Sequence, residues 1–254
     1  MDMAEINLGG KVAIITGSSQ GIGNTLARGF ARAGAFVFMV ARNGSRLESE
    51  VRAIESDGGK ALALPADVTR AEEVEKMASQ ALANSGRIDI LVNCAGGSGE
   101  FRFRPLLDLE ENAWDQVIEL NLKSVYLCCR AVGQHMAEKM GGAIINFSSG
   151  ASIQPVPGMT HYCSAKAAVN QFTRVLAVEW GKYNIRVNAI SPGLTDTEGE
   201  RRWMPPEMME KYSKAVPLGR IGKPEDILGT ALFLASDMSS YLSGAIISVS
   251  GGPQ

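Results

Sequence analysis

The chain has 254 residues, of which 45% are apolar and 20% charged, and its formal net charge is −2 at neutral pH. Such values are typical of one globular α/β domain. The weak net charge excludes the basic field that nucleic acid or an anionic membrane surface attracts. The longest apolar runs, such as 33–41, are too short to span a bilayer, so we expect neither partner.

The first residues and the cysteines indicate a reducing compartment. The opening "MDMAEINLGG" has neither the basic nor the apolar segment of a signal peptide, so we expect a cytoplasmic protein. The four cysteines show no CxxC spacing and the chain has only two histidines. We therefore expect reduced, packed thiols and no metal site.

Strand patterns and helix patterns alternate along the chain. Short apolar runs rich in β-branched residues are typical of parallel strands that are buried on both faces. They predict strands at 11–16, 35–41, 60–68, 88–96, 142–148, 184–190 and 244–250. Apolar residues at helical spacing predict helices from about 22 to 34, at 45–56, 71–83 and 110–140, after 160, and at 224–236. The alternation predicts a doubly wound parallel sheet of seven strands with helices on both faces, in one domain over residues 1–254.

Residues 194–218, "LTDTEGERRWMPPEMMEKYSKAVPL", interrupt this alternation after the sixth expected strand. Ligands of such sheets bind outside the carboxyl ends of the strands. We therefore expect an irregular insertion that forms a substrate lid over the site.

A glycine-rich stretch, "TGSSQGIG" (16–23), joins the first expected strand to the first helix. Gly17, Gly21 and Gly23 allow a tight turn and a close approach of a pyrophosphate to the helix N-terminus. The spacing is GxxxGxG, which differs from the commoner GxGxxG of dinucleotide-binding proteins. Its place between a strand and a helix still predicts nucleotide binding.

Over nearly its whole length the chain resembles the short-chain dehydrogenase/reductase family, including its 3-oxoacyl reductases. The family's TGxxxGxG motif is matched from Thr16 to Gly23, and its Asn-Asn-Ala-Gly motif appears as "NCAG" at 93–96. The family's Pro-Gly after the sixth strand is matched in "SPGLTDT" (191–197). The resemblance implies a Rossmann-type fold and an oxidoreductase that uses NAD(P)(H).

The resemblance also implies a set of residues for the cofactor. They are Gly17, Ser19, Gln20, Gly21, Ile22, Gly23, Arg42, Asp67, Val68, Asn93, Ala95, Gly96, Tyr162, Lys166, Pro192, Gly193, Thr195 and Thr197. An acidic residue at the end of the second strand would bind the ribose of NAD, whereas Arg42 stands there and suits a 2′-phosphate. We therefore expect NADP(H) rather than NAD(H), although many NADP-preferring relatives carry a basic residue where this chain has Gln20.

Tyr162 and Lys166 lie four residues apart, so a helix places them on one face. A neighbouring cation favours the phenolate and lowers the pKa of the phenol, which suits general acid/base chemistry near neutrality. Ser149, thirteen residues before the tyrosine, and Asn121 match the remaining catalytic positions of the family. The serine can hydrogen-bond the substrate oxygen. His161 is adjacent to Tyr162 but points in another direction on a helix, so we expect no role as a base.

The sequence narrows the substrate only to a small carbonyl or alcohol compound. Trp203, Met204, Met208, Met209 and Tyr212 could line an apolar pocket or simply pack against one another. Arginines in the loop 97–104 could meet an anionic substrate, although a solvated rim is the plainer interpretation.

Three classes of function stay open. The first is reduction of a ketone such as a 3-oxoacyl thioester. The second is an enoyl- or dienoyl-CoA reductase, to which "DTEG" (196–199) is similar, and the third is a dinucleotide-sensing protein without catalysis. The complete set of four catalytic residues favours the first. The resemblance further implies a homotetramer or homodimer, with helices around 110–135 and 160–180 in the interface.

Overall fold

Seven parallel strands form one sheet in the order β3-β2-β1-β4-β5-β6-β7, in a computed structural model that describes residues 6–253. The strands are β1 (Val12–Thr16), β2 (Phe36–Ala41), β3 (Lys60–Pro65), β4 (Ile90–Asn93), β5 (Gly142–Phe147), β6 (Ile185–Pro192) and β7 (Ile246–Val249). The strand order reverses between β1 and β4, which is where ligands of doubly wound sheets bind. The predicted fold class is confirmed.

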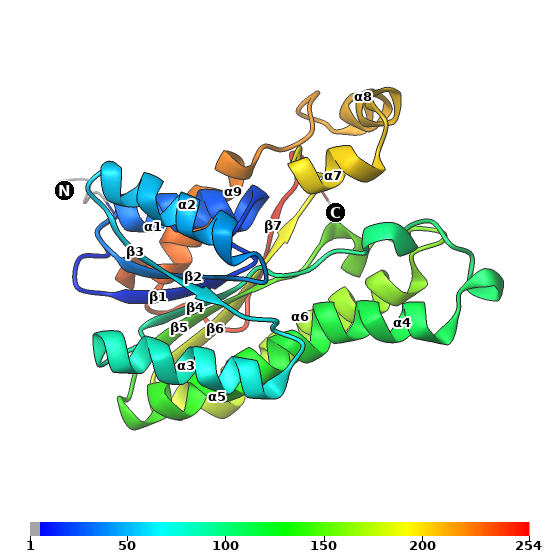
Figure 1. Cartoon of the computed structure of the whole chain (residues 1–254). Coiled ribbons are helices and arrows are strands. Elements are labelled where there is room, and N and C mark those ends of the chain that lie inside the picture. Colours follow the sequence, from blue (N-terminus) through cyan, green and yellow to red (C-terminus); the bar gives the residue numbers. More distant parts are fainter. Residues whose placement is uncertain (1–5, 254) are drawn as a thin grey trace.

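Helices cover both faces of the sheet (Figure 1). On one face lie α1 (Gly21–Arg32), α2 (Gly44–Ser56) and α9 (Pro224–Ala235). On the other lie α3 (Ala71–Ser85), α5 (Ser124–Glu138) and α6 (Thr160–Trp180). Successive strand residues point to opposite faces, so Ile14 packs in the α3/α5/α6 cluster and Ile15 in the α1/α2/α9 cluster. The central strands are buried on both sides, as their uninterrupted apolar sequences predicted.

The prediction of a single helix around 110–140 is wrong in one respect. The structure divides it into α4 (Glu111–Ile118), a π-helical turn η3 (Glu119–Lys123) and α5. Single π turns inside α-helices frequently occur at functional sites. Asn121 is buried in this turn, and its side-chain amide donates to the Val117 carbonyl at 2.9 Å.

Segment 194–218 also differs from the irregular insertion that we expected. It contains two short helices, α7 (Glu198–Trp203) and α8 (Pro206–Ala215). Thr197 caps α7, because its hydroxyl accepts a hydrogen bond from the Glu200 backbone N–H. Pro206 begins α8, where the first residue of a helix needs no backbone N–H for an intrahelical bond. Figure 1 shows both helices standing off the sheet beyond the carboxyl ends of β6 and β7.

Among the helices of residues 6–253, none combines the length and the apolar character that crossing a membrane would require.

A buried polar ladder links the centre of the sheet to α6. The Asn93 amide donates to Asn146 Oδ1 at 2.9 Å, and the Asn146 amide donates to Thr173 Oγ1 at 3.0 Å. All three side chains are at most 2% exposed. Buried polar groups are costly when they lose a partner, so the ladder fixes how α6 sits on β4 and β5.

We predict that Asn146→Ala lowers the free energy of unfolding by about 2–3 kcal/mol, because it removes both bonds and leaves the Asn93 amide underpaired. Chemical denaturation followed by circular dichroism measures this. Asn84→Ala, on the exposed face of α3, serves as the control and should cost less than about 0.5 kcal/mol. Equal effects of the two substitutions would contradict a structural role of the ladder.

Candidate active site

The glycine loop between β1 and α1 leaves no room for side chains. Gly17 has φ +69°, and a Cβ there would lie 2.8 Å from the Cα of Ala95. A Cβ on Gly23 would collide with the Gly17 carbonyl oxygen. No side chain caps α1 at Gln20, so the first backbone N–H groups of the helix are not bonded by a cap. This backbone cradle fits a pyrophosphate.

Two hydroxyl residues that the sequence analysis did not single out hold this loop. Thr16 Oγ1 accepts from the backbone N–H groups of Cys94 and Ala95, both at 3.1 Å. Ser18 Oγ accepts from the Val40 N–H at 2.8 Å. Both residues are at most 1% exposed. Thr16 could have been found from the sequence, because it is the threonine of the TGxxxGxG motif. Ser18 could not, because only the fold shows that the end of β2 lies beside it.

The other predicted residues of the loop are accessible to a ligand. Ser19, Gln20 and Ile22 are half-exposed at the start of α1. Gly21 has φ +57°, and a Cβ there would come within 3.4 Å of the Thr197 side chain. The glycine loop and Thr197 therefore face each other at close range, as two sides of one binding site would.

The candidate adenosine end of the site lies after β2 and β3. Arg42 is exposed directly after β2, and Val68 is 6% exposed. Burial alone would raise the pKa of Asp67. Hydrogen bonds from the Thr69 N–H (3.0 Å) and hydroxyl (2.8 Å), together with the charge of Arg42, hold that pKa below its usual value. Asp67 is thus a fixed, ionised acceptor near Arg42.

Asn93, one of the predicted cofactor residues, has its side chain turned into the sheet, so only its backbone could face a cofactor. Its side chain is 2% exposed and points to α5, where the amide also donates to Cys129 Sγ at 3.3 Å. Asn93 instead fixes the end of β4 through the buried ladder. The next residues of the motif, Ala95 and Gly96, do border the site.

Asn121 and Lys166 meet at Gly96. A Cβ on Gly96 would lie 2.8 Å from Asn121 Oδ1 and 3.1 Å from Lys166 Nζ. Asn121 Oδ1 accepts from the Gly97 N–H at 2.9 Å, and its amide donates to the Gly97 carbonyl at 2.8 Å. The π turn therefore delivers an asparagine that fixes the loop after β4 from both sides.

Ser149, Tyr162 and Lys166 converge at the carboxyl end of β5. The Ser149 hydroxyl interacts with the Tyr162 phenol, and Lys166 Nζ lies 5.6 Å from the centre of the phenol ring. Lys166 is 3% exposed and donates to the Phe147 carbonyl at 2.8 Å. Ser148, the neighbour that could be confused with Ser149, instead donates to the Lys166 carbonyl at 3.3 Å.

The pKa values of this group run opposite to the expectation for the phenol. Burial raises the pKa of Tyr162 to about 12, although the Ser149 hydroxyl works against the increase. Burial lowers the pKa of Lys166 to about 8. The loss of water disfavours both charged forms, and the ammonium group points to the Phe147 carbonyl. Around neutral pH the phenol is protonated, so this arrangement has a proton ready to donate.

The residues directly after β6 form the side of the site opposite the glycine loop. Pro192 ends that strand, and the Gly193 N–H donates to the Val249 carbonyl at 3.0 Å. Thr195 is 5% exposed and donates to the Gly193 carbonyl at 3.0 Å. Of the two threonines, Thr197 is the one that faces the glycine loop.

Side chains of segment 194–218 divide into buried and exposed ones. Met204 is 5% exposed, whereas Trp203, Met208 and Tyr212 are 36–45% exposed. Most of the candidate pocket residues therefore do not pack in a core. In the loop 97–104, Arg104 is exposed, but Arg102 forms an ion pair with Glu200 of α7.

We assign no catalytic role to His161 or to the cysteine thiols. The His161 side chain is fully buried, and burial lowers its pKa, so it is neutral in the fold. The four cysteines are free thiols. Burial raises the pKa of Cys94 to about 12, which makes it a poor nucleophile.

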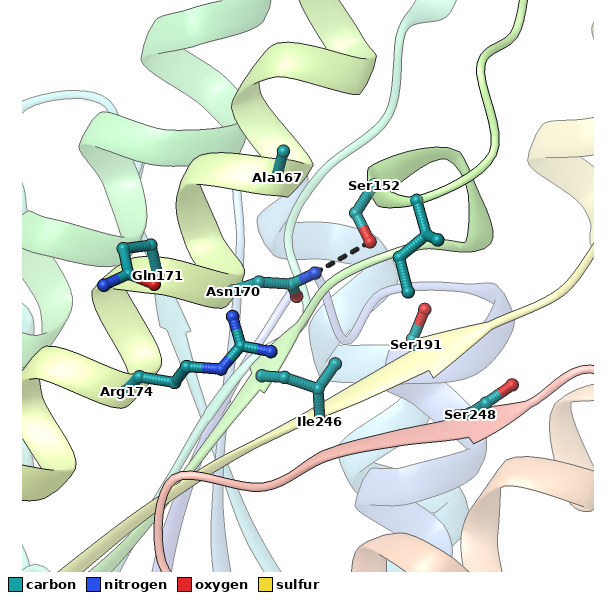
Figure 2. A pocket seen from close by; sticks show the side chains of 9 residues that line it. Ser152, Ala167, Asn170, Gln171, Arg174, Ser191, Ile246 and Ser248 are labelled. Carbon is teal, nitrogen blue, oxygen red and sulfur yellow. Dashed lines mark hydrogen bonds between the residues drawn. The ribbon is translucent and has the colours of Figure 1, made fainter. Parts of the chain in front are cut away.

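A separate cavity of about 430 Å³ opens beyond the catalytic group, between α6 and the edge strand β7 (Figure 2). Figure 2 shows Asn170 reaching from α6 to Ser152 Oγ, with Arg174 and Ile246 nearby. Its lining residues are Ser152, Ile153, Ala167, Asn170, Gln171, Arg174, Ser191, Ile246 and Ser248. None of them is among the catalytic or cofactor candidates, although Ser152 and Ser191 are close in sequence to Ser149 and Pro192.

Comparison with known proteins identifies the family of the chain. Residues 17–254 match the family model described as enoyl-(acyl carrier protein) reductase. The chain belongs to the short-chain dehydrogenase/reductase family. It is therefore an oxidoreductase of a family that uses NAD(P)(H) and acts on alcohol and carbonyl groups.

Relatives within this family carry different names. The chain is 40% identical to 3-oxoacyl-[acyl-carrier-protein] reductase of Chlamydia trachomatis, over 95% of this chain and 96% of that protein. It is 37% identical to NAD-dependent glycerol dehydrogenase of Listeria innocua, over 98% and 95%. A solved 7α-hydroxysteroid dehydrogenase with NADH and 7-oxo glycochenodeoxycholic acid matches with a TM-score of 0.93 and 38% identity, over 97% and 95%.

We predict that Tyr162→Phe lowers kcat for ketone reduction by about 1,000-fold, because the phenolic proton is lost while the ring remains. Dinucleotide affinity should stay within about threefold, since the phenol supplies little of the binding energy. Stopped-flow absorbance of the reduced nicotinamide and fluorescence titration measure the two quantities. Tyr183→Phe, in the short turn that follows α6, is the control. Retained turnover in Tyr162→Phe would rule out this phenol as the proton donor.

Proposed function

We propose that the chain is an NADP(H)-dependent oxidoreductase that transfers a hydride between the nicotinamide and a ketone or secondary alcohol. The observation that carries this proposal is the convergence of Ser149, Tyr162 and Lys166 at the edge of the sheet where the glycine loop lies. The free thiols fit an enzyme of the cytoplasm.

Each catalytic residue has a separate task in this proposal. The bound nicotinamide supplies or receives the hydride. Tyr162 donates its proton to the carbonyl oxygen in reduction and takes it back in oxidation. Ser149 donates a hydrogen bond to the same oxygen as charge develops there. Lys166 favours the phenolate once the proton has left, and Asn121 keeps the loop at Gly97 in place.

The proton balance favours carbonyl reduction over a purely binding role. A phenol with a pKa near 12 holds its proton at neutral pH and suits an acid for a ketone. An enoyl thioester also develops negative charge on its carbonyl oxygen when the hydride adds to carbon, so the substrate screen has to distinguish the two reductions. A dinucleotide sensor would need none of the four catalytic groups. Screening NADPH oxidation with acetoacetyl thioesters, steroids, diketones and 2-enoyl thioesters tests the choice. Turnover of the enoyl compounds alone would favour the second function.

The preference for NADP(H) is supported by the charges at the end of β2. Arg42 is exposed there, and no carboxylate occupies the position that would bind the ribose hydroxyls of NAD. A guanidinium can bind a phosphate with two charge-assisted hydrogen bonds. The relative from Listeria innocua is named as NAD-dependent, so cofactor choice varies among similar chains and must be measured for this one.

Assembly through α5 and α6 is supported by their exposed apolar side chains. Tyr126, Val175 and Val178 are 44%, 43% and 83% exposed, beside a groove of about 350 Å³ between the two helices. Contiguous apolar surface of this kind marks interfaces between proteins. We propose that a second copy covers it, in a homodimer or homotetramer.

We predict that Arg42→Ala weakens NADPH binding by about 10- to 100-fold and leaves NADH binding within about threefold, because only the former carries the 2′-phosphate. Fluorescence titration with both dinucleotides provides the measurement. Arg32→Ala, at an exposed ion pair near the end of α1, is the control. Equal losses for the two cofactors would refute the assigned role of Arg42.

We predict that the double substitution Val175→Glu and Val178→Glu reduces the assembly to smaller species, because two charges placed on α6 would resist burial in the interface. Light scattering coupled to gel filtration measures the mass. Met140→Glu, an exposed position outside the two interface helices, should leave the mass unchanged. A wild-type chain that is a monomer at all concentrations tested would exclude this interface.

A further inference from the structure

Arg102 and Glu200 join the two segments that border the candidate substrate site. Arg102 lies in the loop after β4, residues 97–104, here called the substrate loop, and Glu200 lies in α7. Nη1 of the arginine is 2.7 Å from Oε2 of the glutamate, and Nη2 is 2.9 Å from Oε1. This two-pronged geometry is the strongest that a guanidinium and a carboxylate can adopt.

The pair is less exposed than an ordinary surface ion pair. The Arg102 and Glu200 side chains are 13% and 25% exposed, and Arg102 is the least exposed cation among the ion pairs of residues 6–253. For comparison, Lys214 and Glu210 in α8 are 76% and 67% exposed. Exposed pairs contribute little free energy. A shielded pair that loses one partner leaves a charge without compensation.

Both ends of the pair are held by further contacts. Arg102 Nε donates to Ser98 Oγ at 3.3 Å, and Thr197, a candidate cofactor residue, accepts the Glu200 backbone N–H at 3.2 Å. The substrate loop also contains Phe103 at φ +59°, an uncommon conformation for a bulky residue. Gly158 permits it, because a Cβ there would lie 2.8 Å from the Phe103 Cα.

The two charges act on the Tyr162 phenol in opposite directions. Glu200 raises the pKa of the phenol and Arg102 lowers it. The other groups that act on this phenol are the Ser149 hydroxyl, the Cys163 thiol and, beside the ring, the Lys166 ammonium group. The phenol of Tyr212 in α8 interacts in turn with Arg102. The guanidinium and the carboxylate therefore oppose each other at the reacting group.

An anionic substrate would have to compete with a carboxylate that is already in place. Both terminal nitrogens of Arg102 are bonded to Glu200, so the guanidinium is not free to bind a second carboxylate with the same geometry. An uncharged carbonyl compound requires no such exchange and leaves both segments joined. These facts distinguish the pair from an open receptor for acidic substrates.

We propose that Arg102 and Glu200 are positioning residues that hold α7 against the substrate loop and, as an internally neutralised pair, select uncharged ketones and alcohols over carboxylate-bearing ones. This inference rests on the proposed carbonyl chemistry and names its substrate class. The pair acts on turnover through the position of the lid and through the charge balance at Tyr162.

The positioning role is tested with three variants and without any substrate. Glu200→Gln removes the negative charge but keeps the shape, Arg102→Leu removes the positive charge, and Arg102→Glu with Glu200→Arg exchanges them. Segment 194–218 contains trypsin sites at Arg201, Arg202, Lys211 and Lys214. Cleavage in this segment should be about tenfold faster in both single variants, because each loses a charge-assisted pair. The control Glu210→Gln should behave like the wild type. The exchanged pair should do so at the four sites that it shares with the wild type, with cleavage at the trypsin site that Glu200→Arg adds counted separately by mass spectrometry.

The selectivity is tested with ethyl acetoacetate and acetoacetate, using NADPH oxidation. The wild type should have the higher kcat/KM for the ester. Glu200→Gln should shift the ratio of the two kcat/KM values by about tenfold toward acetoacetate, because Arg102 becomes free to bind its carboxylate. Glu210→Gln should not shift it, and the exchanged pair should restore the wild-type ratio.

The pH profile separates this role from mere stiffening of the fold. The basic limb of kcat/KM for reduction reports loss of protons from the coupled Tyr162 and Lys166 side chains, and a nearby charge moves both pKa values in the same direction. It should move to lower pH in Glu200→Gln, where the positive charge remains, and to higher pH in Arg102→Leu, where the negative charge remains. A purely structural contact would reduce activity in both variants without opposite shifts.

Two kinds of failure can be told apart. If the wild type reduces the ester but the variants change neither trypsin cleavage, nor the ratio, nor the pH profile, the pair has no such role and the proposed function stands. A wild type that prefers acetoacetate overturns the selectivity. Reduction of neither compound, together with no turnover of any ketone in the screening panel, overturns the proposed carbonyl chemistry and the selectivity with it.

Discussion

The close approach of the loops that follow β1 and β4 is the constraint on which the rest of the site depends. A side chain at Gly17 would meet the backbone of Ala95, and the Thr16 hydroxyl binds the N–H groups of Cys94 and Ala95. This contact occurs where the strand order reverses. It leaves the glycine loop open on its other side, toward Thr197, and sets Gly96 beside Lys166.

Burial of the Tyr162 and Lys166 side chains controls proton transfer at the carboxyl end of the sheet. Removal of water raises the pKa of Tyr162 and lowers that of Lys166, so neither side chain readily takes its charged form there. A phenol that stays protonated at neutral pH acts as a proton donor rather than as a base. The shielded Arg102–Glu200 pair adds two charges near it whose effects oppose each other. In our proposal, this pair connects catalysis to the position of α7 through electrostatics.

Helix irregularities serve the site as much as regular elements do. The π turn at 119–123 places Asn121 so that it bonds both the N–H and the carbonyl of Gly97. Apolar periodicity predicted one continuous helix here, because a single extra residue in a turn hardly disturbs a pattern of buried side chains. In the same way, α7 and α8 are too short for periodicity to reveal, although the position of segment 194–218 was evident from the break in alternation.

The sequence by itself determined the order of strands and helices, the glycine loop, the family and the spacing of Ser149, Tyr162 and Lys166, because these depend on local patterns and fixed offsets. Only the tertiary structure decided the rest. It turned Asn93 into the sheet, away from the cofactor site, since alternate strand residues point to opposite faces. It reversed the expected pKa of Tyr162, since burial depends on distant segments. It paired Arg102 with Glu200, residues far apart in the chain that no local pattern connects.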